Sequence, residues 1–501
     1  MTSDVCLLLE GTYPYVAGGV STWVYDLIRK LPDVTFSIVF LGPHRMAYRR
    51  LHYEIPDNVV EFREYFLFDY QVTKEKLPKP TEEDYEVVYN FLMDVKKGKT
   101  DSFEQILNLI GNPNTRKINL HDLVHDELGW RLVERMYQAE KNEVSFVDFF
   151  WTWRFLYLPF FSLLRINMPK AHIYHAVSTG YAGALGALAK INTKRPYILT
   201  EHGIYTRERK IEISKADWIY SESANEIKVV EGKDFFRQWW IQLFSFLSNL
   251  SYQWSDEIIT LHEGNRKVQI EEGAPAEKIK IIPNGFDLTR LRAADPVSKP
   301  VGKKRIGLVG RVVPIKDIKT FIKACRRIAD EIKDVEILIM GPTDEDEEYY
   351  HECLFLTEME GLQHEVHFTG KVKVSDYYPT LDVMVLTSIS ESQPIVILEA
   401  MANGVPCVST DVGACRELLY GRTPDDQLLG QSGIVTPICD PDETAQAVID
   451  LIKNPTQYEQ MSTCGKQRII KYYQMDDLIA NYQVLYSQYS NELDWPVAEE
   501  V

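Results

Sequence analysis

The sequence predicts an α/β protein with two doubly wound, mostly parallel sheets. In each half of the 501-residue chain, short apolar runs alternate with longer amphipathic segments, as expected for parallel strands joined by helices. A polar stretch at 286–303, with Pro296 and Pro300, separates the halves and is typical of an interdomain linker. The chain is also too long for one ordinary core.

The first half, residues 1–285, begins with a strand, a glycine-containing loop and a helix. Strands are predicted at 5–9, 36–41, 59–68, 173–175, 196–200, 257–261 and 280–282. Between about 74 and 165 the pattern becomes helical without a strand, which indicates a helical insertion in this domain.

The second half restarts the alternation and predicts a second domain over 304–470. Its strands are expected at 305–309, 335–340, 366–369, 383–386 and 405–409. The final segment, 471–501, is expected to be a helix that crosses back to the first domain. Two such domains imply a cleft between them, and clefts between domains bind ligands.

Composition excludes several classes of protein. A net charge of −18 argues against broad nucleic-acid binding. The seven cysteines show no C-x-x-C spacing, which favours reduced, mostly buried thiols and gives no zinc site. The N-terminus lacks a basic n-region, and no run of 18 clean apolar residues exists, so we expect a cytoplasmic protein without a spanning helix.

Glu391 and Glu399 form the most informative motif. Glu391 follows the apolar run 383–386, and Glu399 lies about a turn inside a helix predicted at 395–403, where Pro394 suits the first helical position. Ligands of parallel sheets bind at the carboxyl ends of the strands. A carboxylate there can accept hydrogen bonds from a ribose or a hexose. The alternative is that both glutamates are ordinary surface residues.

Glycines and cations follow the first strand of each domain. Gly18 and Gly19 permit close approach of a ligand to the backbone, although a plain tight turn is the alternative. Arg311 and Lys316 lie in the loop after the strand at 305–309. Two fixed cations would stabilise the charge that grows on a diphosphate leaving group. The alternative is a solvated basic loop.

His202 comes just after a predicted strand, and it can donate a hydrogen bond to a sugar hydroxyl or accept its proton. His175 more often fits a structural role. Glu201 is a candidate partner of His202 or a base for the acceptor.

Acidic D-x-D triplets occur at 344–346 and 440–442. Both are expected to cap helices. We therefore predict no catalytic metal.

Aromatic residues recur at helical spacing from Phe146 to Leu164, with Trp151 and Phe155 off that face and Pro159 expected to kink or split the helix. A second aromatic segment runs from Phe235 to Trp254. We interpret both as core. The alternative is a docking face for a membrane partner or a lipid-linked acceptor.

Taken in order, these motifs resemble the retaining glycosyltransferases of family 4, which have the GT-B fold of two Rossmann-like domains facing a cleft. The resemblance rests on Gly18-Gly19-Val20, His202, Pro283-Asn284-Gly285, Gly310-Arg311 through Lys316, Gly341, Gly370 and Glu391 through Glu399. The opening segment, the run 200–209 and the helical insertion resemble the PelF-type transferases of Pel exopolysaccharide synthesis, which makes a cationic polymer of amino sugars. The first domain would then bind the acceptor and the second a nucleotide-sugar.

The resemblance also implies residue roles. Arg311 and Lys316 would bind the donor diphosphate, and Glu399 would bind the ribose. Glu391 would contact the donor sugar, and His202 would lie beside the reacting sugar. The implied catalytic residues are Arg311, Lys316, Glu391 and His202. The implied donor-binding residues are Gly18, Gly19, Arg311, Lys316, Gly341, Lys371, Glu391, Ser392, Ile395, Val396 and Glu399. The implied reaction is front-face, with the acceptor attacking from the side that the diphosphate leaves, and requires neither metal nor cofactor.

One motif departs from the family pattern. Many members have Glu-Gly-Phe-Gly where this chain has Glu391-Ser392-Gln393-Pro394. Because Pro394 has no backbone N–H, the local contacts to the donor must differ. The transferred sugar is therefore not predicted.

The leading hypothesis is a transferase that uses a UDP-sugar to extend a polysaccharide acceptor. Its expected partners are inner-membrane components of an exopolysaccharide synthase, through which it would be peripheral at that membrane. Two alternatives stay open: a GT-B-type sugar epimerase or phosphorylase, and a non-enzymatic scaffold that binds nucleotide-sugar and docks to a membrane synthase.

Overall fold

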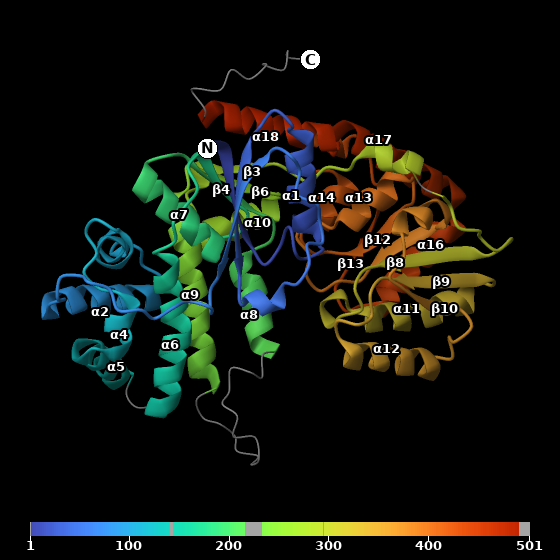
Figure 1. Cartoon of the computed structure of the whole chain (residues 1–501). Coiled ribbons are helices and arrows are strands. Elements are labelled where there is room, and N and C mark those ends of the chain that lie inside the picture. Colours follow the sequence, from blue (N-terminus) through green and yellow to red (C-terminus); the bar gives the residue numbers. More distant parts are fainter. Residues whose placement is uncertain (1, 141–143, 216–232, 294, 490–501) are drawn as a thin grey trace. The chain divides into compact units, whose positions relative to one another are not determined.

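The computed structural model describes residues 2–140, 144–215, 233–293 and 295–489, and it divides into two compact units (Figure 1). Unit 1 contains the described residues of Met1–Thr260, Arg266–Lys280 and Gln483–Val501. Unit 2 contains Leu261–Asn265 and Ile281–Tyr482. Each unit is built on its own sheet, so the predicted architecture of two Rossmann-like α/β domains is confirmed.

Unit 1 has a seven-stranded sheet in the order β3-β2-β1-β4-β5-β6-β7. The strands are β1 Ser3–Glu10, β2 Phe36–Gly42, β3 Val59–Phe66, β4 Ala171–Ala176, β5 Tyr197–Glu201, β6 Glu257–Thr260 and β7 Ile279–Ile281. Strand β1 pairs in parallel with β2 and with β4, so that Leu7 lies opposite both Ile38 and His175. Because β2 and β3 extend the sheet on one side and the later strands on the other, the topological switch point lies between β1 and β4.

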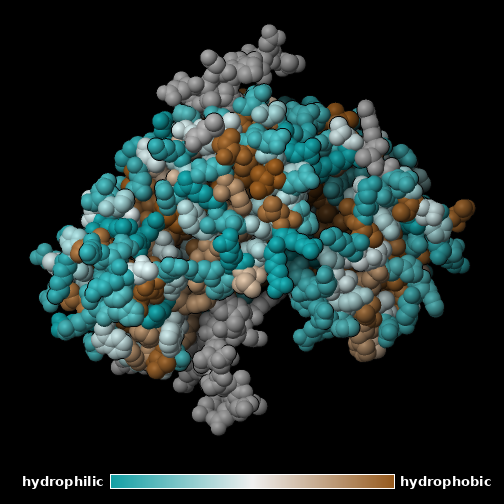
Figure 2. Space-filling view, in the orientation of Figure 1, coloured by the Kyte–Doolittle hydropathy of each residue, from teal (hydrophilic) through white to brown (hydrophobic). Residues whose placement is uncertain are grey.

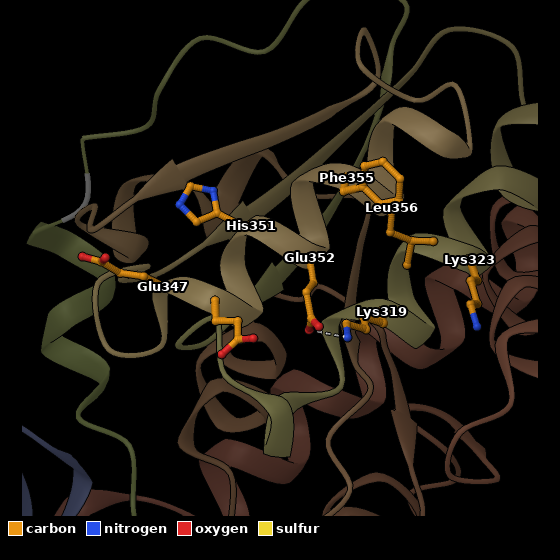
Figure 3. A pocket seen from close by; sticks show the side chains of 8 residues that line it. Lys319, Lys323, Glu347, His351, Glu352, Phe355 and Leu356 are labelled. Carbon is orange, nitrogen blue, oxygen red and sulfur yellow. Dashed lines mark hydrogen bonds and ion pairs between the residues drawn. The ribbon is translucent and has the colours of Figure 1, made fainter. Parts of the chain in front are cut away.

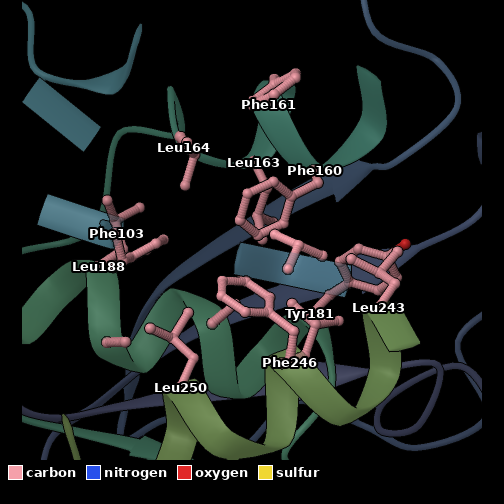
Figure 4. Packing of buried hydrophobic residues seen from close by; sticks show 14 of the residues in the cluster. Phe103, Phe160, Phe161, Leu163, Leu164, Tyr181, Leu188, Leu243, Phe246 and Leu250 are labelled. Carbon is pink, nitrogen blue, oxygen red and sulfur yellow. The ribbon is translucent and has the colours of Figure 1, made fainter. Parts of the chain in front are cut away.

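The helices of unit 1 include a group of five between β3 and β4 in the chain. The helices are α1 Gly19–Lys30, α2 Glu82–Lys96, α3 Phe103–Ile106, α4 Leu120–His125, α5 Glu127–Ala139, α6 Phe146–Leu163, α7 Tyr181–Thr193, α8 Tyr205–Lys215, α9 Lys233–Trp254 and, from Arg266 on, α10 Glu263–Glu271. Figure 1 shows α2, α4, α5 and α6 gathered beside α9. Their apolar faces share a core with α7 and α9, in which Phe103, Phe160 and Phe246 meet (Figure 4).

The two aromatic segments lie mainly in this core. On α6, Trp153 and Tyr157 are buried, while Trp151 and Phe155 are exposed as their position off the aromatic face predicts. On α9, the indole of Trp239 donates a hydrogen bond of 2.7 Å to the Tyr157 hydroxyl. The face visible in Figure 2 is mainly hydrophilic, with apolar residues in small groups.

Pro159 does not split α6, which runs unbroken from Phe146 to Leu163. A proline removes one helical hydrogen bond, to the carbonyl four residues earlier. The helix nevertheless continues through Pro159. The expected split is therefore wrong.

Unit 2 has a six-stranded sheet in the order β10-β9-β8-β11-β12-β13. The strands are β8 Lys304–Val309, β9 Val335–Met340, β10 Val366–Gly370, β11 Val383–Leu386, β12 Cys407–Thr410 and β13 Gly433–Thr436. Each neighbouring pair is parallel. The order reverses between β8 and β11, which makes that junction the switch point of this sheet.

Helices cover both faces of this sheet and bury two apolar clusters against it. They are α11 Ile318–Glu331, α12 Glu347–Met359, α13 Ile395–Ala402, α14 Cys415–Tyr420, α15 Pro424–Gln427, α16 Pro441–Lys453, α17 Pro455–Tyr472 and α18 Met475–Tyr489. The last part of α18, from Gln483, groups with unit 1.

The acidic triplets cap helices, as predicted. The Asp346 side chain accepts a hydrogen bond from the Tyr349 amide at the start of α12, and Asp440 accepts one from Glu443 at the start of α16. Each carboxylate satisfies an otherwise unpaired N–H of the first turn.

The stretch 286–303 is tied to unit 2. Val297 donates a backbone hydrogen bond of 3.0 Å to Asp376, and the Arg305 guanidinium donates one of 3.0 Å to the Ser298 carbonyl. Among the residues described, no helix is long and apolar enough to cross a membrane. All seven cysteines are free, and only Cys439 is exposed.

Candidate active site

The carboxyl edge of the unit 2 sheet gathers most of the predicted site residues. Lys316 follows β8, Gly341 follows β9, Lys371 follows β10, and Glu391 follows β11. Since β8 and β11 are neighbours at the switch point, Lys316 and Glu391 come from the two loops that flank it.

Lys316 and Glu391 form an ion pair, although they are far apart in the chain. Glu391 Oε1 also accepts a hydrogen bond of 2.7 Å from the Ser388 hydroxyl. The two side chains are 19% and 13% exposed, so the pair is shielded but reachable. Ile389 N donates to the Ile315 carbonyl at 2.9 Å, which fixes the two loops against each other.

Glycines make room for the lysine and for the backbone beneath it. The aliphatic stem of Lys316 passes 3.6 Å from the place where a Cβ on Gly310 would stand. A Cβ on Gly341 would lie 2.0 Å from the Gly310 carbonyl oxygen, so only glycine fits there. The loops after β8 and β9 therefore pack closely at this edge.

Arg311 pairs with a different carboxylate from Lys316. It makes an ion pair with Glu345, and both side chains are about half exposed. The acidic start of α12 supplies this carboxylate, a partner that the spacing of Arg311 and Lys316 does not reveal. Lys371 is exposed.

Glu399 occupies the second turn of α13 and is held by Tyr378. The Tyr378 hydroxyl donates a hydrogen bond of 2.7 Å to Glu399 Oε2, and Tyr378 is only 1% exposed. Burial raises the pKa of Glu399, while the bond from Tyr378 and the charge of Arg290 oppose the rise. Helix α13 begins at Ile395, so Pro394 is its N-cap and not its first helical residue. The helix starts one residue later than Pro394 suggests because the proline keeps an extended ψ of 111°.

The residues around Glu391 are braced by partners distant in the chain. Gln393 Oε1 accepts a hydrogen bond of 2.6 Å from the Asn284 amide, and the Ser392 hydroxyl accepts one of 3.1 Å from the Asn265 side chain. The Ala414 amide donates to the Ser392 carbonyl at 2.7 Å. Ile395 and Val396 follow directly in the first turn of α13.

Gly18 and Gly19 lie at the start of α1 in unit 1. Gly18 is the N-cap, Gly19 is the first helical residue, and both are exposed. No side chain caps this helix, which leaves the N-terminal amides for solvent or a ligand.

His202 follows β5 and packs against Trp23 of α1. Their ring centroids are 4.7 Å apart and the rings are nearly perpendicular. Burial lowers the pKa of His202 to about 4, so its imidazole is neutral near pH 7. A neutral imidazole can donate through one nitrogen and accept through the other.

Glu201 is enclosed by four hydrogen-bond donors. Thr179 and the Tyr205 amide donate to Oε1 at 3.1 Å, and Tyr252 and Gln269 donate to Oε2 at 2.7 Å. The residue is 1% exposed. A carboxylate so enclosed anchors the segment beside His202, and the hypothesis that it serves as the acceptor's base loses its geometric basis.

His175 is a structural residue in β4. It is fully buried between the Tyr486 hydroxyl at 2.7 Å and the Thr200 hydroxyl at 2.8 Å. Burial lowers its pKa to about 3.

In the described part of the chain, neither a cluster of metal ligands nor the surface hollow on α11 and α12 belongs to the predicted site. No group of three or more His, Cys, Asp or Glu side chains in this part of the chain is arranged to hold a metal ion. A surface hollow of about 950 Å³ lies on α11 and α12, where Lys319 pairs with Glu352 (Figure 3). None of the predicted site residues lines that hollow.

Known proteins are similar to this chain over part of their length. The chain is 25% identical over 201 residues to N-acetyl-alpha-D-glucosaminyl L-malate synthase of Bacillus anthracis, covering 40% of this chain and 49% of that protein. It is 26% identical over 275 residues to the uncharacterized glycosyltransferase MJ1607 of Methanocaldococcus jannaschii, covering 50% and 63%. The chain thus spans about half to two thirds of these relatives.

Solved structures share the fold over nearly the whole chain. Sucrose-phosphate synthase of Thermosynechococcus elongatus is 15% identical with a TM-score of 0.59, covering 97% of this chain and 98% of that one. HepE of Anabaena, solved with UDP, is 14% identical with a TM-score of 0.59, covering 97% and 100%. These proteins have the GT-B fold, and the chain shares it.

Two family descriptions divide the chain near the boundary of its units. Residues 3–277 match "Domain of unknown function (DUF3492)", which is more than half of the chain. Residues 303–454 match "Glycosyl transferases group 1". The chain therefore belongs to the DUF3492 family and carries a group 1 glycosyltransferase domain in its second unit.

Proposed function

We propose that the protein is a retaining glycosyltransferase that transfers a sugar from a UDP-sugar to a growing exopolysaccharide. The observation that carries the proposal is the Lys316–Glu391 pair at the switch point of the unit 2 sheet, with Glu399 on the next helix. The similarity of residues 303–454 to group 1 glycosyltransferases supports it. HepE, a structural relative, was solved with UDP and with UDP-glucose.

Lys316 is the group best suited to the donor diphosphate. Its ammonium group is shielded and held beside Glu391, and a fixed cation stabilises an anionic leaving group more in a shielded site than in water. When a diphosphate binds, it can pair with Lys316 in place of Glu391. The Glu391 carboxylate is then able to accept hydrogen bonds from the donor sugar. Glu399, on the following helix, is assigned to the ribose.

The proposed mechanism has the acceptor hydroxyl attack from the side that the diphosphate leaves. The bond from the sugar to the diphosphate breaks as the bond to the acceptor oxygen forms, and a phosphate oxygen takes the acceptor proton. Glu391 is already engaged by Lys316 and Ser388, which suits an orienting role better than attack on the sugar carbon. The route needs no metal, so transfer should persist in EDTA.

The finer specificity rests on the resemblance to PelF-type transferases. It makes an amino-sugar polymer the proposed product, the cytoplasm the proposed location, and an inner-membrane synthase the proposed partner. Arg311, Gly341 and Lys371, with the first-turn residues Ile395 and Val396, complete the proposed donor site in unit 2. The resemblance assigns His202, Gly18 and Gly19 of the first domain to the same reaction.

Calorimetric titration of the purified full chain with UDP, GDP and ADP tests the proposal. We expect UDP to bind, and Lys316→Ala to weaken that binding about tenfold or more, because a charge-assisted hydrogen bond is lost. Lys319→Ala is the matched control, since Lys319 is a partly exposed lysine of α11 that pairs with Glu352.

Three results would change the proposed function. Equal binding of UDP by both variants would remove Lys316 from the donor site. UDP binding without turnover of any UDP-sugar, tested with polysaccharide acceptors, would favour the non-enzymatic scaffold. Turnover that inverts the anomeric centre, read by NMR of the product, would refute retention.

A further inference from the structure

The loop that carries Glu391 is held differently on its two sides. Before Glu391, the Ile389 amide donates a hydrogen bond of 2.9 Å to the Ile315 carbonyl, which ties the loop to the neighbouring loop after β8. After Glu391 comes the run Ser392-Gln393-Pro394, at which the motif departs from the family pattern. The family pattern therefore does not explain what fixes this second side.

The side chain of Gln393 makes a paired link on the second side. Its Oε1 accepts a hydrogen bond of 2.6 Å from the Asn284 amide, and its Nε2 donates a longer one of 3.5 Å to the Asn284 carbonyl. One side chain thus bonds to both backbone groups of one residue, as a neighbouring strand would. Gln393 and Asn284 are each 7% exposed. Because both polar atoms of its amide are engaged by Asn284, Gln393 is not expected to contact a ligand itself.

The turn that holds Gln393 is itself fixed within unit 2. A Cβ on Gly285 would stand 2.5 Å from the Gln474 carbonyl oxygen, so glycine is required where the turn meets that backbone. The next amide along the chain, that of Phe286, donates a hydrogen bond of 2.8 Å to the Tyr473 carbonyl. Gln393 therefore ties the loop to a turn that is anchored on the segment between α17 and α18.

Close packing also restricts the backbone at Glu391 and Ser392. A Cβ on Gly413 would stand 2.2 Å from the Ser392 carbonyl oxygen and 2.3 Å from the Glu391 carbonyl oxygen, so only glycine fits there. The Ala414 amide donates a hydrogen bond of 2.7 Å to the Ser392 carbonyl. The direction of the Glu391 side chain thus depends on these contacts and on the link through Gln393.

Loss of the Gln393 link should move Glu391 more than the rest of the donor site. The buried Asn284 amide would lose its acceptor, and a buried N–H without a partner is unfavourable, so the loop would rearrange to satisfy it. Lys316 lies in the loop after β8, and Glu399 lies inside α13 and is held there by a separate hydrogen bond. A change at Gln393 should therefore affect a ligand group that meets Glu391 more than one that meets Lys316 or Glu399.

We propose that Gln393 is a positioning residue that sets Glu391 against the donor sugar, and that it thereby determines how well the protein distinguishes a UDP-sugar from UDP. The roles of Glu391 as the sugar contact and of Lys316 and Glu399 as the nucleotide contacts rest on the proposed function. The role of Gln393 rests on its paired bonds with Asn284 and on the anchoring of that turn.

The test is calorimetric titration of the full chain with UDP, UDP-glucose, UDP-galactose and the N-acetylated forms of both sugars. The quantity compared is the Kd for UDP divided by the Kd for the UDP-sugar that the wild type binds most tightly. Gln393→Met keeps the length of the side chain and removes both hydrogen bonds. We expect it to lower this ratio about 3–10-fold while the Kd for UDP stays within about twofold of the wild type. Gln431→Met, at an exposed glutamine of unit 2, is the matched control and should leave both values within about twofold.

Gln393→Glu keeps the test decisive if Gln393→Met fails to fold. Its carboxylate still accepts from the Asn284 amide but cannot donate to the Asn284 carbonyl, so we expect a ratio between those of the wild type and the methionine variant. A ratio that is unchanged in every variant that folds overturns the proposal. So does a Kd for UDP that weakens as much as the Kd for the UDP-sugar, because a purely structural role would affect both ligands equally.

The wild-type titrations separate this proposal from the proposed function. If the wild type binds a UDP-sugar and the variants keep its ratio, the role of Gln393 is refuted and the donor site stands. If the wild type binds UDP but none of the four UDP-sugars, the sugar contact at Glu391 and the role of Gln393 are refuted, while the diphosphate contact at Lys316 stands. A wild type that binds neither UDP nor a UDP-sugar refutes the donor site and this role together.

Discussion

Each unit places a glutamate at the switch point of its sheet, on different strands of the central pair, and the two glutamates have different partners. In unit 2, Glu391 is paired with the cation Lys316. In unit 1, Glu10 is held by a tyrosine hydroxyl and a backbone amide. A switch point determines where a ligand binds, whereas the partner of the carboxylate determines which ligand charge is favoured there. The cation paired with Glu391 suits a diphosphate, whereas Glu10 is held by neutral donors and has the charge of Arg209 nearby.

The largest expected effect is on Lys316. Lys316→Ala should lower kcat/KM for sugar transfer by about 10²–10³-fold, because a fixed charge at the leaving group is lost. Lys316→Arg, which keeps the charge, should retain more activity than the alanine variant. Steady-state rates with a UDP-sugar and an oligosaccharide acceptor measure this, and an alanine variant as active as Lys319→Ala would break the comparison between the two edges.

Glu201 and Glu10 should differ in what their removal does to stability. Glu201→Ala leaves four donors without an acceptor in a buried site, so we expect it to lower the free energy of unfolding by about 2–4 kcal/mol. Glu10→Ala strands two donors beside solvent and should cost less. Urea denaturation of both variants measures the difference, and an equal loss would mean that Glu10 is as structural as Glu201.

The pH dependence of stability should also identify Glu201. Burial raises its pKa to about 7, although Gln269 and Tyr252 oppose the rise. Between the ordinary carboxyl value of 4.5 and about 7, the folded state holds more protons than the unfolded state, so this contribution to stability falls as pH rises through that window. Glu201→Gln cannot titrate. The free energy of unfolding of the wild type minus that of this variant should therefore fall from pH 4.5 to pH 7. A constant value would contradict the assignment.

The sequence predicts residues at strand ends better than it predicts their partners. Lys316, Gly341 and Glu391 follow apolar runs that form parallel strands, so their arrival at one edge follows from the alternation of strands and helices. Ser388 and Tyr378, which hold Glu391 and Glu399, are absent from that prediction because their contacts depend on side-chain direction and on how each loop packs.

In unit 1, too, the sequence predicts the position of a residue better than its partner. Glu10 follows the buried run 5–9, so its position at a strand end was readable from the sequence. Its partner Tyr205 lies almost two hundred residues later, and that pairing exists only in the fold.

The smallest expected effect concerns Tyr378, which acts through Glu399 and so positions it. Tyr378→Phe removes a hydroxyl that donates to Glu399 Oε2 and leaves the ring in place. If Glu399 binds the ribose, its loss of orientation should raise the Kd for UDP by about 3–10-fold, in line with one hydrogen bond to a charged group. Tyr377→Phe, at the half-buried neighbour, is the control.

A purely structural role for Tyr378 would lower stability and leave the Kd unchanged. Comparing the Kd for UDP with the Kd for inorganic pyrophosphate separates the two roles further, because only UDP carries a ribose. If Tyr378→Phe weakens the binding of UDP but not of pyrophosphate, Glu399 contacts the nucleoside and not the diphosphate, which is what the assignment of the diphosphate to Lys316 requires.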